Sequence, residues 1–146
     1  MAANQTQRVE KVKVVLDTNI LVSSLSRRSK SNWVIQAFLK KEFDLVVTHE
    51  MLLEYEEILR IKYHGAAVDN FLRSIKDSEN VEMVEVYFQW KLLQDPDDDK
   101  FVDAVIASGA DYLVSEDRDF KLLQKVDFPK VAVLRLADFE KILNQT

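Results

Sequence analysis

The chain has 146 residues, 47% of them hydrophobic, with 2 Gly, 2 Pro, no Cys and a formal net charge of −5. This length suits one domain with a real core, and the scarcity of Gly and Pro excludes a flexible linker or a turn-rich all-β protein. The lack of cysteine excludes disulfides, zinc–thiolate sites and cysteine nucleophiles.

Residues 1–10 are polar, and we expect them to form a flexible tail before a single domain over residues 11–146. The tail lacks the apolar segment of a signal peptide, and no run of the chain approaches the ~18 apolar residues of a membrane helix. We therefore expect a cytoplasmic protein without a membrane partner. The acidic charge argues against a general nucleic-acid coat, because such proteins are usually basic.

The first half of the chain alternates apolar strands with helices. The nearly continuous apolar run at 11–16 is typical of a strand covered on both faces, and 43–47 predicts a second buried strand. Helical spacing, with Ser31 and Thr48 as candidate N-caps, predicts the intervening helices. These helices are expected over 20–25, 33–41, 50–62 and 66–77, with Gly65 breaking the chain before the last of them.

The second half continues this alternation. Residues 81–86 predict a strand, whereas 90–93 is hard to assign. A helix is expected to open at Asp98 or Asp99 and to stop at Gly109. The last elements are expected as a strand over 111–115, a short helix over 120–124, a strand over 131–134 and a helix over 137–143. This order predicts an α/β fold, a parallel sheet with helices on both faces.

Acidic side chains lie at the ends of these elements. Asp17 follows the first strand, Asp117 follows the fourth, and Asp98 or Asp99 begins the helix that leads to the fourth. Each acid alone could simply be a helix N-cap. Folding can bring their carboxylates within about 4–6 Å, where they repel one another and need a compensating cation. Bound Mg²⁺ or Mn²⁺ is the simplest compensation, because hard ions take oxygen ligands.

The helix expected over 50–62 offers a further carboxylate. Its apolar stripe centres near Tyr55, which puts Glu54 and Glu56 about 100° to either side, at the borders of the stripe. A glutamate at such a border can reach a cleft while its helix packs on the sheet. Spacing alone does not choose between Glu54 and Glu56.

Four segments together resemble the PIN domain family of metal-dependent ribonucleases. More narrowly, the sequence resembles bacterial PIN proteins described as toxin components of toxin–antitoxin systems. The segments are VVLDTNILVS (14–23), EMLLEY (50–55), DPDDDKF (95–101) and GADYLVSEDRDF (109–120). They follow the family's order along nearly the whole chain. The resemblance implies a three-layer α/β/α sandwich with a mainly parallel central sheet.

The resemblance also implies which residues form the site. Catalytic metal ligands are expected at Asp17, Glu54, Asp99 and Asp117, with Asp119 as a further ligand. Ser115 and Asn19 would lie just outside the ligands and orient a carboxylate or water. The run of three aspartates leaves Asp98, otherwise also expected outside the ligands, as a rival to Asp99. Glu116 stands where the family often has Gly.

The implied function is an endoribonuclease that uses Mg²⁺ or Mn²⁺ to hydrolyse phosphodiester bonds of single-stranded or structured RNA. The protein would be the toxin of a toxin–antitoxin pair, with a small antitoxin protein as partner and a tendency to form dimers. The alternative is a PIN-fold module that binds RNA or protein with little or no nuclease activity. Two other families fit less well: a haloacid-dehalogenase-like phosphatase needs Asp where Asn19 stands, and a response-regulator receiver needs an acidic pair where only Asp17 is present.

Overall fold

A parallel sheet forms the centre of the protein, whose computed structural model describes residues 11–145. Its strands are β1 (Lys13–Leu16), β2 (Asp44–Val47), β3 (Val81–Met83), β4 (Tyr112–Val114) and β5 (Val133–Leu134). Their spatial order is β3-β2-β1-β4-β5, and every pair in this sheet is parallel. The predicted α/β fold is confirmed, and the sheet is wholly rather than mainly parallel. The predicted tail over 1–10 lies outside the described residues.

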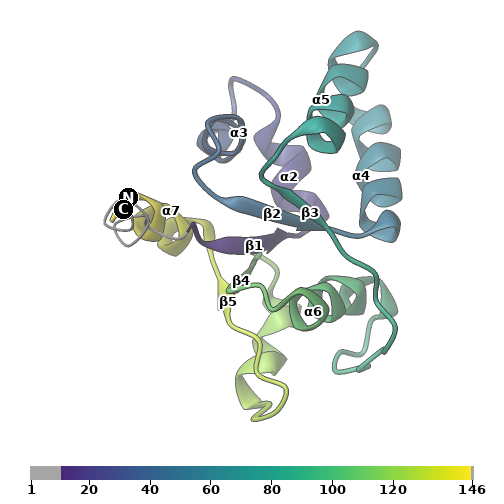
Figure 1. Cartoon of the computed structure of the whole chain (residues 1–146), viewed down its shortest axis with the longest axis vertical. Coiled ribbons are helices and arrows are strands. Elements are labelled where there is room, and N and C mark those ends of the chain that lie inside the picture. The colour runs from purple at the N-terminus through teal and green to yellow at the C-terminus, as the bar shows by residue number, and fades with distance from the viewer. Residues whose placement is uncertain (1–10, 146) are drawn as a thin grey trace, which may run out of the picture.

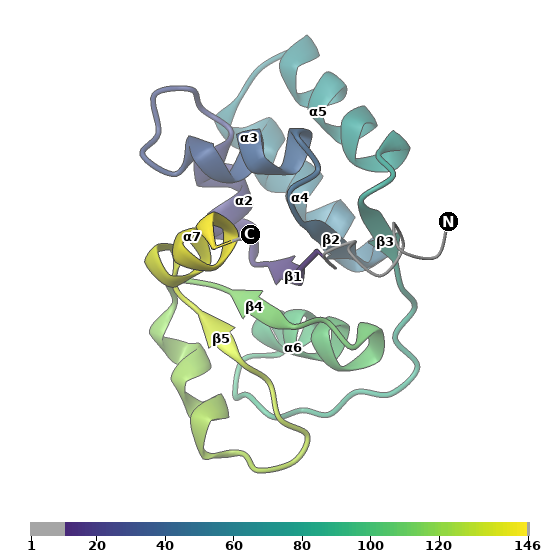
Figure 2. The same ribbon diagram turned by 60° about the vertical axis from the view of Figure 1, so that its left-hand side comes forward.

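Helices cover both faces of the sheet, which gives three layers. They are α2 (Thr18–Ser24), α3 (Asn32–Leu39), α4 (His49–Lys62), α5 (Ala66–Asp77), α6 (Pro96–Ser108), the 3₁₀ helix η1 (Arg118–Lys125) and α7 (Leu136–Asn144). Helices α2 to α5 and α7 lie on one side of the sheet, and α6 lies on the other (Figures 1 and 2). Within residues 11–145 no helix is both long and apolar enough to cross a membrane.

The core explains why these segments take their places. Val14, Val15 and Leu16 are at most 1% exposed, as expected for the central strand of a sheet covered on both faces. Helix α7 is fixed to the face that carries α3 by Phe139. Its ring lies 5.2 Å from that of Phe43 and 5.7 Å from that of Trp33. Aromatic contacts of this kind join the C-terminal helix to the first half of the chain.

Helix α6 begins earlier than the sequence predicts, and this shift matters for the site. Asp95 is its N-cap: the carboxylate accepts from the backbone N–H of Asp97 at 2.9 Å. Pro96 follows at the first helical position, where a missing N–H is tolerated. Asp97, Asp98 and Asp99 therefore all lie in the first turn of α6. Consecutive residues of a helix project about 100° apart, so these three carboxylates point in different directions.

Other differences from prediction concern the lengths of elements. The strand expected over 81–86 ends at Met83, although the N–H of Val84 still donates to Val47 at 2.9 Å. Residues 84–94 then form a long connection to α6. The helix expected over 120–124 is a 3₁₀ helix that begins at Arg118, because Asp117 caps it. The boundaries of short elements depend on such capping contacts more than on hydrophobic pattern.

The strand order reverses between β1 and β4. The chain passes from β1 through β2 to β3 at one edge, and then returns to β4 and β5 on the other side of β1. The register aligns Leu16 with Val114, so that Asp17 and Ser115 are the next residues on the two neighbouring strands. In open parallel sheets, ligands bind at the carboxyl ends of the strands where the order reverses. This position is where the acidic residues gather.

Candidate metal centre

Asp17 lies at the end of β1 and is only 5% exposed. Its Oδ1 accepts from the backbone N–H of Ile20 at 2.8 Å, so it is the N-cap of α2. Its Oδ2 accepts a short hydrogen bond from the hydroxyl of Ser115. Burial raises the pKa of Asp17, and the negative charges of Asp117 and Glu116 raise it further, while the two hydrogen bonds oppose the shift. The carboxylate is thus held in one orientation at the carboxyl end of β1, where the acidic residues gather.

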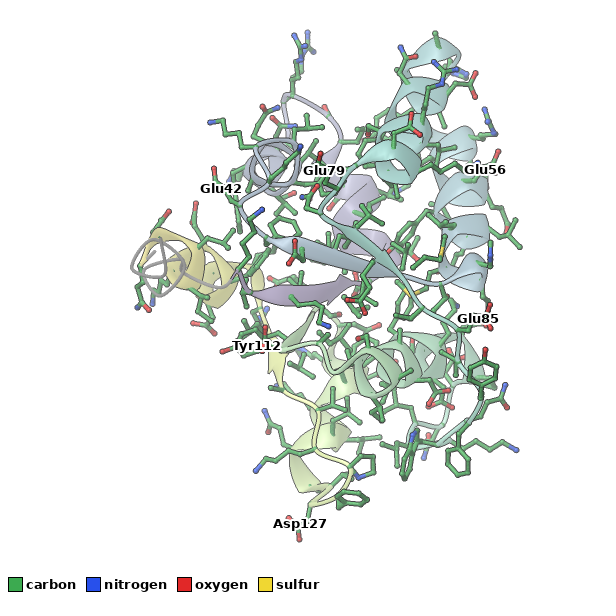
Figure 3. All side chains as sticks on the ribbon, viewed as in Figure 1. Glu42, Glu56, Glu79, Glu85, Tyr112 and Asp127 are labelled. Atoms are coloured by element: carbon green, nitrogen blue, oxygen red, sulfur yellow. The ribbon has the colours of Figure 1, made fainter. Side chains whose placement is uncertain are left out.

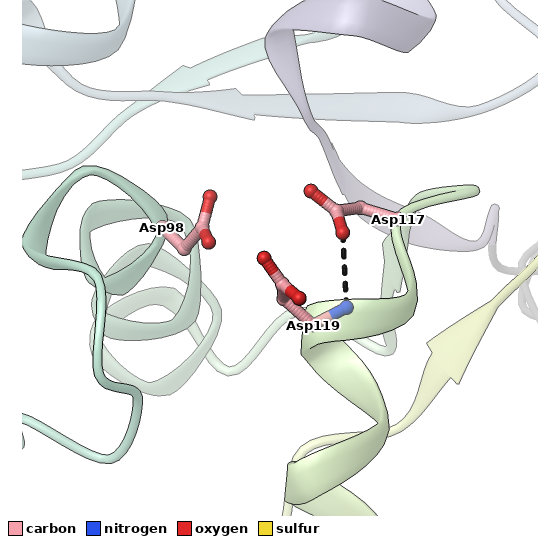
Figure 4. A group of neighbouring side chains, drawn as sticks. All are labelled: Asp98, Asp117 and Asp119. Carbon is pink, nitrogen blue, oxygen red and sulfur yellow. Dashed lines mark hydrogen bonds between the residues drawn. The ribbon is translucent and has the colours of Figure 1, made fainter.

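Asp98, Asp117 and Asp119 form what we call the three-carboxylate cluster. One carboxylate oxygen of each lies within 4.8 Å of the others (Figure 4). Asp98 comes from the first turn of α6, whereas Asp117 and Asp119 lie at the start of η1. The N–H of Asp119 donates to Asp117 at 2.9 Å, and the N–H of Asp117 donates to the hydroxyl of Ser115 at 3.0 Å. Local capping of η1 therefore arranges two of the three acids.

The electrostatics of the cluster favour a cation. Partial burial and, after it, the charges of Asp95, Asp117 and Asp119 raise the pKa of Asp98 to about 6, while Lys100 opposes the shift. Among residues 11–145, no Lys or Arg forms a salt bridge with a carboxylate of the cluster. Two Mg²⁺–oxygen bonds span up to ~4.2 Å, so small side-chain rotations bring these oxygens to ligand distance. The residues fit a hard divalent cation.

Asp99 does not join this cluster. Its Oδ1 accepts from the backbone N–H of Leu93 at 2.9 Å, which ties it to the connection before α6. The resemblance implies Asp99 as a ligand with Asp98 as its rival, and the structure brings Asp98 together with Asp117 and Asp119. The reason is that the whole run lies in the first turn of α6, where consecutive side chains project about 100° apart.

Glu54 lies toward the carboxyl ends of the strands where the acidic residues gather, whereas Glu56 does not. Glu54 Oε1 lies 2.8 Å from Nζ of Lys100, and its other oxygen accepts a short hydrogen bond from the hydroxyl of Thr18. Glu56 instead pairs with Arg60 at 2.9 Å on the outer side of α4. The hydroxyl of Tyr55 donates to the carbonyl of Leu16, which anchors α4 to the end of β1. Of the two glutamates, the structure therefore brings Glu54 to the site.

Lys100, the cation next to the acidic run in the sequence, is a further residue at the border of the site. It is 8% exposed, and besides Glu54 its ammonium group contacts the carbonyl oxygen of Asp97 at 2.6 Å. Its only sequence signal is its place directly after the acidic run. A buried lysine is charged only when it has partners, and Glu54 supplies one.

Two residues next to the acids in sequence make no hydrogen bond to them in the part of the chain that the structure describes. Asn19 is exposed on α2, and among the described residues its side chain makes no hydrogen bond to the acids. Glu116 accepts from Nε of Arg135 at 3.3 Å and from the N–H of Leu136 at 3.1 Å. Glu116 therefore contacts the start of α7, and it affects Asp17 only through its charge, which raises the pKa of Asp17.

Comparisons with known proteins agree with this arrangement. A family model described as PIN domain matches residues 13–119. The solved structure of FitAB bound to an IR36 DNA fragment has a TM-score of 0.56 and 11% identity, over 84% of this chain and 94% of that chain. The PIN domain endonuclease Utp24 has a TM-score of 0.50 and 18% identity, over 84% of each chain. No curated protein sequence matches significantly.

At such low identities the structural likeness shows the fold alone. The family model, in contrast, covers far more than half of the chain and includes Asp17, Glu54, Asp98 and Asp117. The chain therefore belongs to the PIN domain family.

Proposed function

We propose that this protein is a metal-dependent endoribonuclease whose cation, Mg²⁺ or Mn²⁺, is held by the three-carboxylate cluster together with Asp17 and Glu54. The observation that carries the proposal is the approach of Asp98, Asp117 and Asp119 to within 4.8 Å, at the edge where the strand order reverses. Asp98 is a better ligand than Asp99, because Asp98 lies with Asp117 and Asp119 whereas Asp99 is turned to the N–H of Leu93. Family membership supports a nuclease.

A divalent cation at this site supplies Lewis-acid stabilisation of charge on the scissile phosphate and lowers the pKa of water. The protein's own contribution is to hold the acids in position before substrate arrives. Ser115 is central to this, because its hydroxyl donates to Asp17 and accepts from the N–H of Asp117. It links acids from two strand ends. A preorganised set of charges needs little rearrangement during the reaction.

Lys100 adds a positive charge at the border of the site. Its ion pair holds Oε1 of Glu54, while the hydroxyl of Thr18 holds the other oxygen. Glu54 is thereby oriented without any contribution from bound metal. Because Asp98 has a pKa of about 6, protons compete with the cation for this carboxylate below about pH 6. We expect cation affinity to fall as pH decreases through that range.

The finer parts of the proposal concern substrate and partners. We propose RNA as the substrate, a toxin role with a small antitoxin protein as partner, self-association as a dimer, and a cytoplasmic location. The similarity to FitAB, whose structure holds a DNA fragment, and to the endonuclease Utp24 supports a nucleic-acid substrate or partner. The cysteine-free sequence suits a reducing compartment.

Cleavage of end-labelled single-stranded RNA tests the proposal. The wild-type protein should cleave with Mn²⁺ or Mg²⁺ and not with EDTA, and Asp117→Asn should lower the rate by about 100-fold or more. Asp127→Asn is the matched control, because Asp127 is an exposed acid at the far end of the molecule (Figure 3). Cleavage that survives in Asp117→Asn would refute the site. RNA binding without any cleavage would favour the non-catalytic PIN module.

A further inference from the structure

A cavity lies on the other side of the first turn of α6 from the three-carboxylate cluster. Its volume is about 760 Å³, within the ~300–1,000 Å³ typical of small-molecule sites. Its walls are the N-terminal ends of α4 and α6 and the connection 84–94, which begins beside Glu85 (Figure 3). Asp98 belongs to the cluster, whereas Asp97 and Asp99 line this cavity. The two sites therefore share one turn of helix.

The connection that walls the cavity is held by specific contacts. Asp99 accepts from the N–H of Leu93 at 2.9 Å, and Asp103, one turn later on α6, accepts from the N–H of Trp90 at 3.1 Å. Asp103 is only 5% exposed, so this anchor is buried. The ring of Trp90 packs against Phe88, with centroids 4.8 Å apart, and against Phe128 at 6.1 Å. The wall is thus a defined part of the fold.

An aromatic ring stands at the rim of this cavity. Tyr87 is 89% exposed, and its hydroxyl makes a short hydrogen bond to Glu85. A largely exposed aromatic ring beside a cavity is costly to leave in water, and nucleic-acid-binding proteins use such rings to stack unpaired bases. Phe88 is also 63% exposed on the same connection.

The charges on the lining indicate which part of a nucleotide fits. The acidic side chains there are Glu50, Glu85, Asp97, Asp99 and Asp103. Two lysines, Lys91 and Lys100, also line the cavity, and Lys100 pairs with Glu54 at the border of the metal site. This excess of acceptor oxygens repels a phosphate but accepts hydrogen bonds from base amino groups. Cytosine, adenine and guanine carry such amino groups, whereas uracil does not.

We propose that this cavity binds one unpaired base of the substrate next to the scissile phosphate, and that it prefers an amino-bearing base over uracil. The inference rests on the proposed nuclease function for its substrate, RNA. The base lies against Tyr87, its amino group meets the carboxylates of the lining, and its backbone leads past Lys100 to the metal site. Glu50, exposed at the start of α4 and close enough for its charge to affect Asp103, is an accessible acceptor.

Equilibrium binding of fluorescein-labelled hexanucleotides tests this subsite separately from cleavage. The wild-type protein is titrated with rC₆, rA₆ and rU₆ in Ca²⁺, and intact RNA is verified on a gel. We expect rC₆ and rA₆ to bind about tenfold more tightly than rU₆, as for one good base contact. Glu50→Gln should bring this ratio close to one, because glutamine also donates to uracil. Glu57→Gln, an exposed glutamate farther along α4, should leave the ratio unchanged.

A second pair of variants tests stacking. Tyr87→Ala should weaken binding of all three hexanucleotides by about tenfold and preserve their order, because stacking tolerates any base. Ile61→Ala removes another exposed apolar side chain, 70% exposed and outside the cavity lining, and should change nothing. Thermal melting of each variant verifies that it is folded.

Several results would overturn the subsite. Equal affinity of the wild type for all three hexanucleotides would do so, as would a base preference that survives Glu50→Gln. If Tyr87→Ala changes the sedimentation of the RNA-free protein but leaves its RNA affinity intact, the rim is a contact between copies of the chain instead. If cleavage depends on Asp117 but RNA binding shows no base preference, the subsite is refuted and the nuclease function is not. Base preference without cleavage refutes the nuclease function and leaves the subsite in place.

Discussion

Replacement of Asp98 by asparagine should stabilise the protein in the absence of metal. Asp98 is a partly buried carboxylate near Asp117 and Asp119, and its pKa is raised from 3.8 to about 6. A raised carboxylate pKa means that the folded state favours the protonated form. The ionised form therefore costs stability, and this cost appears as pH rises from about 4 to about 6 and persists above that range. Asparagine keeps the shape of the side chain and removes the charge.

The magnitude follows from the pKa change. A shift from 3.8 to about 6 corresponds to at most about 3 kcal/mol, at about 1.4 kcal/mol for each pH unit. Solvent screening of this partly exposed group reduces the figure to about 1–2 kcal/mol. For a chain of this size, that raises the melting temperature by roughly 3–6 °C at pH 7.5. At pH 4.5 the gain should fall to about a third, because Asp98 is then largely protonated in the folded state.

Thermal unfolding in EDTA, at pH 7.5 and pH 4.5, measures this gain. Asp97→Asn is the control, since Asp97 lies in the same turn of α6 but outside the three-carboxylate cluster. Saturating Mg²⁺ should reverse the order, because cation at about 100 times its Kd stabilises the wild type by about 2.7 kcal/mol and the variant much less. The reasoning fails if Asp98→Asn melts below the wild type in EDTA at pH 7.5, or if Asp97→Asn gains as much.

Two further substitutions probe the supports of the site by urea denaturation. Lys100→Met should lower stability by about 2 kcal/mol, because Glu54 loses the ammonium 2.8 Å away, and an unchanged stability would show that this ion pair is inert. Tyr55→Phe should cost about 1–2 kcal/mol, because the carbonyl of Leu16 loses a buried donor, and a loss below about 0.5 kcal/mol would contradict that anchor.

The strands and most helices were predictable because local signals agree with the final packing. The apolar run at the first strand corresponds to β1, whose last three residues are fully buried. Helix α5 begins and ends where helical spacing and Gly65 predict. The prediction of acids at the strand ends also follows from local pattern, because strand–helix junctions are visible in the sequence.

The assignment within the acidic run was not predictable in the same way. Consecutive side chains of a helix project about 100° apart, so which aspartate faces Asp117 depends on whether the run lies inside α6, and that depends on the cap made by Asp95. Asp98 therefore reaches Asp117, while Asp99 holds the connection at Leu93. Likewise, nothing local distinguishes a buried Lys100 from a solvated one, because its partner Glu54 lies far away in sequence.

The sequence by itself determined the α/β class, the positions of the strands and the presence of acids at their carboxyl ends, because hydrophobic period and capping residues act over a few residues. Only the tertiary structure decided which acids meet, which glutamate of α4 faces them and where the cavity beside α6 opens. Those outcomes depend on how α4, α6 and η1 pack around the reversal point between β1 and β4, and packing joins residues that are distant along the chain.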